Sequence, residues 1–570
     1  MSIADSRPST LFTVKETLTS VVIAFVLAFV ARGFVVEAFL IPTGSMAPTL
    51  LGQHMKMRAD NSGYAWDVGP WDFDAAGNPL AIQGGRSRIN PQTNRVERAG
   101  GGPIIVTDPM SRAPSTGPTG EGLSNVPLMA GDRIFVLKYL YSIFDPNRFD
   151  VAVFKNPRDP GVNYIKRLVG LPGEQVALID GDVFTRKPTP DDATGGPPLL
   201  RGSSRADSWS LPGWQIARKP EIAQRAMWQP VFNSEYTPLD ALAGKPGFIN
   251  PWQGEASDSG WQIARRRSYL HGPGAGTLTW NAVQWPISDA YAYNELPPPR
   301  LRPRSYPVSD VAVSFGLLPQ SPKIDASVVV TTRGHQFRIG IFQGSRAKIE
   351  SRVFEATAEW TTLAEGELSS PLPADRVTNL EFWHVDQSLS LWVEGSRVLT
   401  ADYDWTPAER VQNALNLSMK EVAEGPSDML TDASRYPQAG VRIDLVSDQG
   451  YELFRVSLAR DIHYQAAVYG IVENGQPHSR QGEPAMATHP SQTPTLGPDQ
   501  FFACGDNSPA SLDLRLMDAP DPWVSRQFDD DMGVIPRQLL IGRAFFVYFP
   551  SIRTSHNLPV PDFGRMRWIW

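Results

Sequence analysis

The first strong feature of the chain is a run of apolar residues near its N-terminus. Residues 18–36 are nearly all apolar, and residues 21–31 contain no polar side chain. A helix of this length spans about 28 Å, close to the thickness of the hydrocarbon layer of a membrane. No cleavage site with two small residues follows the run, which argues against a removed leader. The pattern therefore predicts one transmembrane helix over residues 17–36, with Arg32 reaching the headgroups.

Basic residues before the run set its expected orientation. Arg7 and Lys15 precede it, and basic residues are enriched on the cytoplasmic side of membrane proteins. We therefore expect residues 1–16 to form a cytoplasmic tail. The rest of this single-pass protein would then lie on the extracytoplasmic side of the inner membrane.

Beyond this run, short apolar stretches alternate with turns. Residues 134–137 and 150–154 have strand patterns, and the turn signal Asp145-Pro146-Asn147 lies between them. The chain contains 51 prolines and 47 glycines, which favour turns and short strands over long helices. The predicted fold class is therefore mainly β, behind the one N-terminal helix.

The densest series of strand patterns lies between residues 305 and 465. Residues 380–385 and 389–393 alternate on both sides of the polar pair Asp386-Gln387, which predicts a β-hairpin. Further strand-like runs cover residues 311–315, 327–331, 337–342, 347–353, 441–445 and 453–458. This spacing predicts an inserted antiparallel β-sandwich, which resembles in pattern only the jelly-roll sandwiches of laminin-G and legume-lectin type.

The composition excludes several classes of function. The formal net charge of −7 argues against a nucleic-acid-binding protein, which would need a basic surface. The single cysteine, Cys504, excludes an intrachain disulfide and any zinc site built from several thiolates. No two of the eight histidines are spaced to share a metal from one helix. We therefore expect no metal, no cofactor and no nucleic-acid partner.

Three segments carry residues that could perform chemistry. Residues 41–50 follow the apolar run directly and place Ser45 in a turn. Residues 163–174 place Lys166 inside an apolar strand pattern, where burial of the charge is costly because water solvates it better. Residues 505–515 form a polar loop after an apolar stretch. With the strands that begin after Gly131-Asp132, these segments make four blocks in a fixed order.

In this order and behind an apolar run, the four blocks resemble the conserved boxes of bacterial type I signal peptidases, which use a Ser–Lys dyad. The resemblance covers chiefly residues 37–58, 129–187 and 491–550. It implies that Ser45 is the nucleophile and that Lys166 is the general base. It also implies oxyanion or supporting roles for Thr43, Ser511, Asp506, Asp513, Arg167 and Arg515.

Within these supporting residues, the resemblance assigns three different tasks. The Thr43 hydroxyl would join the Ser45 backbone N–H in the oxyanion hole. The Ser511 hydroxyl would orient the lysine. The acidic and basic residues of the set would form ion pairs that support the loop.

The chemistry of a serine–lysine pair agrees with these roles. A serine hydroxyl is a weak nucleophile until a base takes its proton. Lysine can be that base only when neutral, and its ordinary pKa is about 10.4. Burial beside Tyr164, Ile165 and Leu168 would lower this pKa, and a shift of roughly two to three units leaves a useful neutral fraction near pH 8. A histidine is not needed.

The strand before Ser45 indicates the class of substrate. Alternation places Phe39 and Ile41 on one face of this strand. We expect them to line shallow apolar pockets together with Pro42 and Ile165, and such pockets accept a methyl group but not a large side chain. This agrees with the Ala-x-Ala preference that the family implies. The expected partners are precursor proteins that carry signal peptides with Ala-x-Ala-like sites, together with the lipid bilayer.

The resemblance divides the chain into an interrupted catalytic domain and two insertions. The expected parts after the membrane helix are the catalytic domain at 37–58, 129–187 and 491–570, a first insertion at 59–128, a linker or small β-region at 188–304, the sandwich at 305–465 and a linker at 466–490. Both ends of the second insertion join the same domain and should lie close together. Its removal is therefore expected to leave activity.

The first insertion contains two short segments that resemble the knuckles of a zinc ribbon. Residues 59–64 and 108–111 have the spacing of such knuckles, but the cysteines of C-x-x-C pairs are absent. The segment is therefore expected to hold together without zinc, because structural zinc needs thiolate or imidazole ligands.

The residues leave two other functions open. The protein could be an anchored binding or scaffold protein in which the sandwich acts and the peptidase domain is vestigial. It could also be a related Ser–Lys enzyme that cleaves itself or a regulator. The presence of Ser45, Lys166 and Ser511 together favours an active signal peptidase over the first, and the apolar run directly before Ser45 counts against the second.

Overall fold

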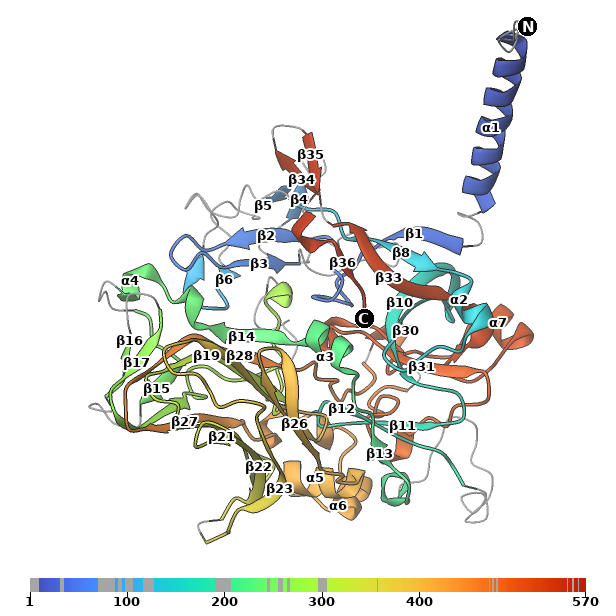
Figure 1. The fold of residues 1–570 in the computed structure, drawn as a ribbon. Helices are drawn as coiled ribbons and strands as arrows, with labels where there is room; N and C mark the ends of the chain where they lie inside the picture. The colour runs from blue at the N-terminus through green and yellow to red at the C-terminus, as the bar shows by residue number, and fades with distance from the viewer. Residues whose placement is uncertain are drawn as a thin grey trace, which may run out of the picture.

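The computed structural model describes residues 10–30, 35–69, 88–90, 95–97, 106–115, 128–189, 207–242, 247–254, 260–263, 267–295, 305–355, 357–470, 472–473, 476–477, 480–550, 552–555, 558–561 and 563–570. Residues 1–9 of the expected cytoplasmic tail and most of residues 70–127 lie outside this description. In the described part the molecule is mainly β, as the sequence predicts (Figure 1).

The N-terminal apolar run forms helix α1 (Thr10–Val30), which projects away from the rest of the molecule (Figure 1). Among the described residues, no helix is both long and apolar enough to cross a membrane. The prediction of a transmembrane helix over residues 17–36 is therefore not supported. The first half of α1 carries Lys15, Glu16 and Thr19, and the chain from Val36 onward is already a strand.

Strands from three distant parts of the chain form one antiparallel sheet of eight strands, here called the Lys166 sheet because β10 carries Lys166. Its strands are β1 (Val36–Leu40), β8 (Arg133–Leu137), β33 (Leu540–Phe549), β9 (Val151–Asn156), β10 (Asp159–Gly170), β31 (Gln500–Cys504) and β32 (Ile535–Pro536) in spatial order, with β36 (Arg567–Trp568) beside β33. The strands predicted around residues 134–137 and 150–154 are confirmed as β8 and β9, and the apolar stretch at 501–503 lies in β31. Apolar residues from β9, β10 and β31 fill the core beside this sheet.

The sandwich consists of two antiparallel sheets that enclose one large apolar core (Figure 1). The first sheet contains β16 (Gln262–Ile263), β17 (Tyr269–His271), β28 (Tyr451–Arg460), β19 (Val311–Pro319), β24 (Thr378–Val385), β25 (Ser388–Val393) and β26 (Ser396–Asp402), with β14 (Gln229–Asn233) beside β28. The second contains β15 (Trp252–Gly254), β18 (Gly274–Trp280), β27 (Gly440–Ser447), β20 (Ile324–Thr332), β21 (His335–Phe342), β22 (Arg346–Val353) and β23 (Thr361–Glu367).

The strand runs predicted within 305–465 are all present in these two sheets. The predicted hairpin is confirmed, since β24 pairs with β25. Its two turn residues, Asp386 and Gln387, have φ values of 48° and 55°, as a two-residue turn with left-handed backbone requires. Strands from the 188–304 segment also pair with sandwich strands, although glycines and prolines interrupt the patterns there.

Smaller hairpins and short helices complete the fold. The hairpin strands are β2 (Met55–Arg58) with β3 (Ala65–Val68), β4 (Arg88–Asn90) with β5 (Arg95–Glu97), β6 (Val106–Thr107) with β7 (Pro114–Ser115), β11 (Gln175–Ile179) with β12 (Asp182–Arg186) and β13 (Gln215–Ile216), β29 (Val472–Glu473) with β30 (Gln476–Pro477), and β34 (Ile552–Ser555) with β35 (Leu558–Pro561). The helices are α2 (Leu140–Ile143), α3 (Glu221–Met227), α4 (Leu239–Leu242), α5 (Pro407–Leu415), α6 (Met419–Glu424) and α7 (Pro522–Gln527).

The inserted region packs directly on the β11–β12 hairpin, which follows the strand that carries Lys166. Helices α5 and α6 each begin with a capping box, in which side chain and backbone satisfy each other's free N–H groups. Their buried residues Val411 and Val422 share an apolar cluster with Ile179 and Phe184 of the β11–β12 hairpin. The sandwich is therefore attached through a core and not through a linker alone.

The two segments that resemble zinc-ribbon knuckles lie against each other. Asp108 accepts hydrogen bonds from the hydroxyls of Ser62 (2.8 Å) and Ser111 (2.7 Å). The backbone N–H of Met110 donates to the other carboxylate oxygen of Asp108 (2.8 Å). All four residues are buried, so one carboxylate joins the two segments through neutral donors.

Candidate active site

Ser45 lies in a tight turn between β1 and β2. The backbone N–H of Ala47 donates to the carbonyl oxygen of Gly44 at 2.9 Å, which closes the turn around Ser45. Met46 and Leu50 are fully buried in the core, whereas Ser45 itself is half-buried. Apolar neighbours therefore hold the turn while the serine keeps access to solvent.

Lys166 lies on β10, which runs between β9 and β31, and it is only 4% exposed. Its Nζ is 2.7 Å from the Ser45 Oγ and 3.1 Å from the carbonyl oxygen of Ile165. Burial lowers the pKa of Lys166 to about 8, although Asp513 and Asp506 favour its charged form. A neutral lysine at this distance can accept the serine proton.

Two buried ion pairs surround this lysine. Arg167 donates to both carboxylate oxygens of Asp506, at 2.8 and 2.6 Å. Arg515 donates to both carboxylate oxygens of Asp513, each at 2.8 Å. Asp513 also accepts the backbone N–H of Gly505 at 2.8 Å. The four residues that the resemblance assigns to ion pairs therefore form two bidentate pairs, and these fix the loop after β31.

Asn507 connects this loop to the nucleophile turn. Its backbone N–H donates to the carbonyl oxygen of Ser45, and its side-chain Nδ2 donates to the carbonyl oxygen of Gly44, both at 3.0 Å. The side chain of Asn507 was not expected to matter from the sequence, because an asparagine in a polar loop has no distinctive pattern. Its position in the 505–515 block is the only signal that points to it.

The resemblance gives roles to the hydroxyl groups of Thr43 and Ser511. Thr43 is half-buried, two residues before Ser45. Ser511 is 6% exposed, and its hydroxyl makes no hydrogen bond to any residue that the structure describes. It lies against Gly505, where an added Cβ would come within 2.2 Å of the Ser511 Oγ. The structure thus does not bring Ser511 into a hydrogen bond with Lys166.

The residues expected to line the substrate pockets separate into two groups. Ile41 is buried, and Phe39 and Ile165 are half-buried against the same apolar cluster. Pro42 is exposed at the start of the nucleophile turn. Three of the four residues therefore share one apolar cluster: Phe39 lies on β1, Ile41 directly follows β1, and Ile165 lies on β10.

Part of the chain matches a known family. Residues 122–194 match the model described as "Signal peptidase, peptidase S26", and this stretch contains Lys166 but neither Ser45 nor the 505–515 loop. The chain is 43% identical over 63 residues to signal peptidase I of Rickettsia prowazekii and 37% identical over 91 residues to that of Rickettsia rickettsii. These matches support a type I signal peptidase domain.

The coverage of these relatives is small. The first match covers 11% of this chain and 24% of the relative, and the second covers 12% and 34%. The chain thus spans between a quarter and about a third of the curated relatives that it matches. Outside the signal peptidase domain, most of the chain has no counterpart in these two alignments.

Solved structures of β-rich proteins align with parts of the chain. The carbohydrate binding module CBM66 from Bacillus subtilis covers 37% of this chain and 96% of its own length, with a TM-score of 0.22 and 10% identity. The galectin LEC-6 from Caenorhabditis elegans covers 28% and 91%, with a TM-score of 0.16 and 15% identity. No function follows from either likeness.

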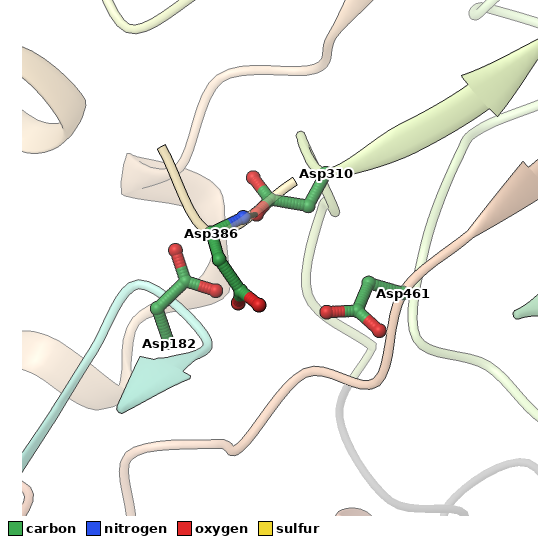
Figure 2. A group of neighbouring side chains, drawn as sticks. All are labelled: Asp182, Asp310, Asp386 and Asp461. Carbon is green, nitrogen blue, oxygen red and sulfur yellow. Dashed lines mark hydrogen bonds between the residues drawn. The ribbon is translucent and has the colours of Figure 1, made fainter. Parts of the chain in front are cut away.

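A second group of buried charges lies between the signal peptidase domain and the sandwich. Figure 2 shows Asp182, Asp310, Asp386 and Asp461, whose carboxylate oxygens lie within 4.8 Å of one another. With Asp180 we call them the carboxylate cluster. Asp182 begins β12, and the other three in the figure flank strands of the sandwich. Sequence analysis missed the cluster because each aspartate stands alone at a strand end.

The chemistry of the cluster suits an ion-pair network better than a metal centre. Carboxylate oxygens are the ligands that calcium and magnesium prefer, but here they face basic side chains. Arg333 pairs with Asp180 at 2.6 Å and with Asp310 at 2.8 Å. Lys219 pairs with Asp461 at 2.8 Å and also contacts Asp386. Arg410 binds both Asp180 and Asp182. The network joins the β11–β12 hairpin to the sandwich.

Proposed function

We propose that the protein is a serine endopeptidase that removes N-terminal signal peptides from secreted precursors. Ser45 is the nucleophile and Lys166 is the general base. The observation that carries this proposal is the 2.7 Å contact between the Lys166 Nζ and the Ser45 Oγ, combined with burial that lowers the pKa of this lysine to about 8. The matched family supports the same class of reaction.

The proposed reaction is an acyl transfer in two steps. The Ser45 Oγ attacks the scissile carbonyl carbon while its proton passes to the Lys166 Nζ. The backbone N–H of Ser45 and the Thr43 hydroxyl stabilise the negative oxygen that forms. The tetrahedral intermediate then breaks its C–N bond, and Lys166 returns the proton to the leaving amine. Water, activated by the same lysine, hydrolyses the acyl-enzyme.

The supporting residues act around this dyad. The Arg167–Asp506 and Arg515–Asp513 pairs hold the strand and the loop that flank Lys166. Ser511 orients the lysine once substrate closes the site, since hydrogen bonds of a catalytic centre often tighten only in the complex. Phe39, Ile41, Pro42 and Ile165 are proposed to form pockets for the small residues of an Ala-x-Ala site.

The test is cleavage of a peptide that contains an Ala-x-Ala signal peptide site, followed by mass spectrometry of the products. Ser45→Ala and Lys166→Ala should each abolish cleavage, and the double variant should lose no more than either single one, because the two residues act as one unit. Lys155→Ala is the matched control, since Lys155 is an exposed lysine on the adjacent strand β9. Cleavage by Lys166→Ala at more than a few per cent of the wild-type rate would contradict the proposal.

The pH dependence gives an independent check. Because the folded pKa of Lys166 lies near 8, the neutral base is present above this pH and is lost as the pH falls. kcat/KM should therefore rise with pH through about 8 and then level off. A rise centred near pH 6.5 would point to a histidine instead.

A further inference from the structure

The inserted region supplies a loop that reaches the nucleophile turn. Residues 289–295, which include the 3₁₀-helix η6 (Ala292–Asn294), lie about 250 positions after Ser45 in the sequence. The loop is anchored on its own side by Asp289, which accepts hydrogen bonds from the backbone N–H of Tyr306 (2.7 Å) and from the Gln465 Nε2 (2.6 Å). These two hydrogen bonds hold the start of the loop at Asp289, and the end of the loop contains Tyr293 and Asn294.

Tyr293 packs directly on the residue before the nucleophile. A Cβ added to Gly44 would lie 2.1 Å from a ring carbon of Tyr293, so the ring lies flush against the Gly44 backbone. The Tyr293 hydroxyl donates to the carbonyl oxygen of Gln53 at 2.7 Å, and its own carbonyl accepts from Gly69 at 2.8 Å. Tyr293 is 7% exposed and shares an apolar cluster with Ala47 of the turn.

Asn294 forms a reciprocal amide pair with Asn507. The Asn294 Nδ2 donates to the Asn507 Oδ1 at 2.7 Å, and the Asn507 Nδ2 donates to the Asn294 Oδ1 at 2.9 Å. An amide group has two N–H donors, and the Asn507 Nδ2 also donates to the carbonyl oxygen of Gly44. Asn294 therefore determines how the Asn507 amide is rotated, and that amide holds the Gly44 carbonyl together with the backbone N–H of Ala47.

The Gly44 carbonyl and the Ser45 N–H belong to the same peptide unit. Because this unit is planar and trans, its C=O and N–H point in opposite directions. A hydrogen bond that fixes the carbonyl also fixes the direction of the N–H. This N–H is the donor to the oxyanion in the reaction proposed above, so its orientation matters for the transition state more than for substrate binding.

We propose that residues 289–295 of the inserted region form part of the catalytic scaffold, and that Asn294 is a positioning residue that orients the Ser45 N–H through Asn507 and Gly44. This inference rests on the proposed function of Ser45. It assigns the insertion a task in catalysis, and the loop acts by holding backbone groups and not by touching the substrate.

The experiment compares Asn294→Ala with the wild type in the full chain. kcat for the Ala-x-Ala peptide should fall roughly tenfold to a hundredfold, because a misdirected oxyanion donor loses part of the 10²–10³ that such a donor contributes. KM and the pH midpoint near 8 should stay unchanged, since neither the pocket nor Lys166 is altered. The Asn507→Ala variant should show the same pattern, and the double variant should lose no more than Asn507→Ala alone.

A second readout reports the oxyanion site directly. A peptide boronate with an Ala-x-Ala sequence forms a tetrahedral adduct with an active serine, and its affinity should fall in Asn294→Ala by the same factor as kcat. Binding of the uncleaved peptide, measured in the Ser45→Ala background, should be unaffected by Asn294→Ala. Tyr293→Phe, which keeps the ring and removes one hydrogen bond, should lose less than fivefold in kcat.

The matched control is Asn379→Ala, an exposed asparagine at the start of β24 in the same insertion, which should have wild-type kcat. Unchanged kcat in Asn294→Ala, an equal loss in Asn379→Ala, or a loss that follows only a lower melting temperature would overturn this inference. None of these three outcomes contradicts the proposed roles of Ser45 and Lys166, provided that Ser45→Ala is inactive. Activity in Ser45→Ala would instead overturn the proposed function.

Discussion

The proposed catalytic centre and the carboxylate cluster both bury several charged groups, but they balance these charges differently. Beside Lys166, each carboxylate has its own guanidinium, since Arg167 pairs with Asp506 and Arg515 with Asp513. In the carboxylate cluster, the described ion pairs divide the basic groups Lys219, Arg333 and Arg410 among five aspartates. The surroundings of Lys166 contain separate ion pairs, whereas the carboxylate cluster contains more acidic groups than basic ones.

This difference changes the titration of the aspartates. Burial favours a neutral Asp513, but Arg515, the backbone N–H of Gly505 and the charge of Lys166 together outweigh burial and keep the pKa of Asp513 below its usual value. Burial and the nearby Asp310 raise the pKa of Asp182 well above its usual value, although Arg410 opposes them. Burial raises the pKa of Asp386 to about 6, with partial compensation by Lys219. The pKa of the paired Asp513 is thus lowered, whereas the crowded cluster is divided. Arg333 and Arg410 lower the pKa values of Asp180 and Asp310 despite burial, and the pKa values of Asp182 and Asp386 are raised.

The largest effect is expected from Asp513→Asn. This change leaves the Arg515 guanidinium buried without its counter-charge, and breaking a buried pair in this way costs about 3–5 kcal/mol. Urea unfolding at pH 7 should show that loss in the free energy of unfolding. Asp448→Asn, at an exposed aspartate, should change it by less than about 0.5 kcal/mol. If Asp513→Asn lowers the free energy of unfolding by less than about 1 kcal/mol, Asp513 and Arg515 do not form a stabilising ion pair.

The same contrast explains which parts of the site the sequence predicts. Ser45 and Lys166 can be proposed from the sequence because each lies in a local block, and alternation within single strands predicts β8, β9 and the hairpin at β24–β25. The carboxylate cluster assembles from single residues at separate strand ends, so no local pattern contains it. No local pattern indicates a role for Asn294 either, because its proposed role depends on its hydrogen bonds to Asn507, which lies 213 positions away.

Two expectations from the sequence need revision on physical grounds. The apolar run predicts a spanning helix, but the polar first half of α1 and the start of β1 at Val36 limit its apolar length. The common ends of the second insertion predict that its removal leaves measurable activity. Its apolar contact with the β11–β12 hairpin and the contacts of Tyr293 and Asn294 argue against this. Ends that lie close together do not make the segment between them independent.

A smaller effect is expected from the pH dependence of stability at Asp386. Its folded pKa of about 6 lies above the unfolded value of about 3.9, so the folded state binds more protons between these values. The contribution of Asp386 to the free energy of unfolding is therefore present at low pH. This contribution, on the order of 2 kcal/mol, is lost as the pH rises through about 6. Burial lowers the pKa of the adjacent His384 to about 4, so His384 stays neutral in this window.

Urea unfolding of the wild type and of Asp386→Asn at pH 5 and pH 7 measures this contribution. The wild type should lose more stability than the variant between these pH values, because asparagine cannot ionise. Titrating groups remote from the cluster contribute equally to both proteins and cancel in the difference, whereas Lys219 and Asp461 interact with Asp386 and belong to the measured effect. Equal pH slopes would show that Asp386 is ionised throughout and that the cluster is balanced after all.

The smallest effect is expected from Asp182→Asn, although the substitution is the same as at Asp513. Burial and the nearby Asp310 raise the pKa of Asp182 and so favour its neutral carboxyl, and asparagine has nearly the same shape as that neutral form and the same zero charge. The amide oxygen can still accept the hydrogen bond that Arg410 donates to Asp182. The free energy of unfolding should therefore change by less than about 1 kcal/mol.

The infrared band of a protonated carboxyl should be present in the wild type and lose intensity in the variant. A loss as large as that of Asp513→Asn, with no change in this band, would show that Asp182 is ionised. The carboxylate cluster and the catalytic centre would then balance their charges by the same rule.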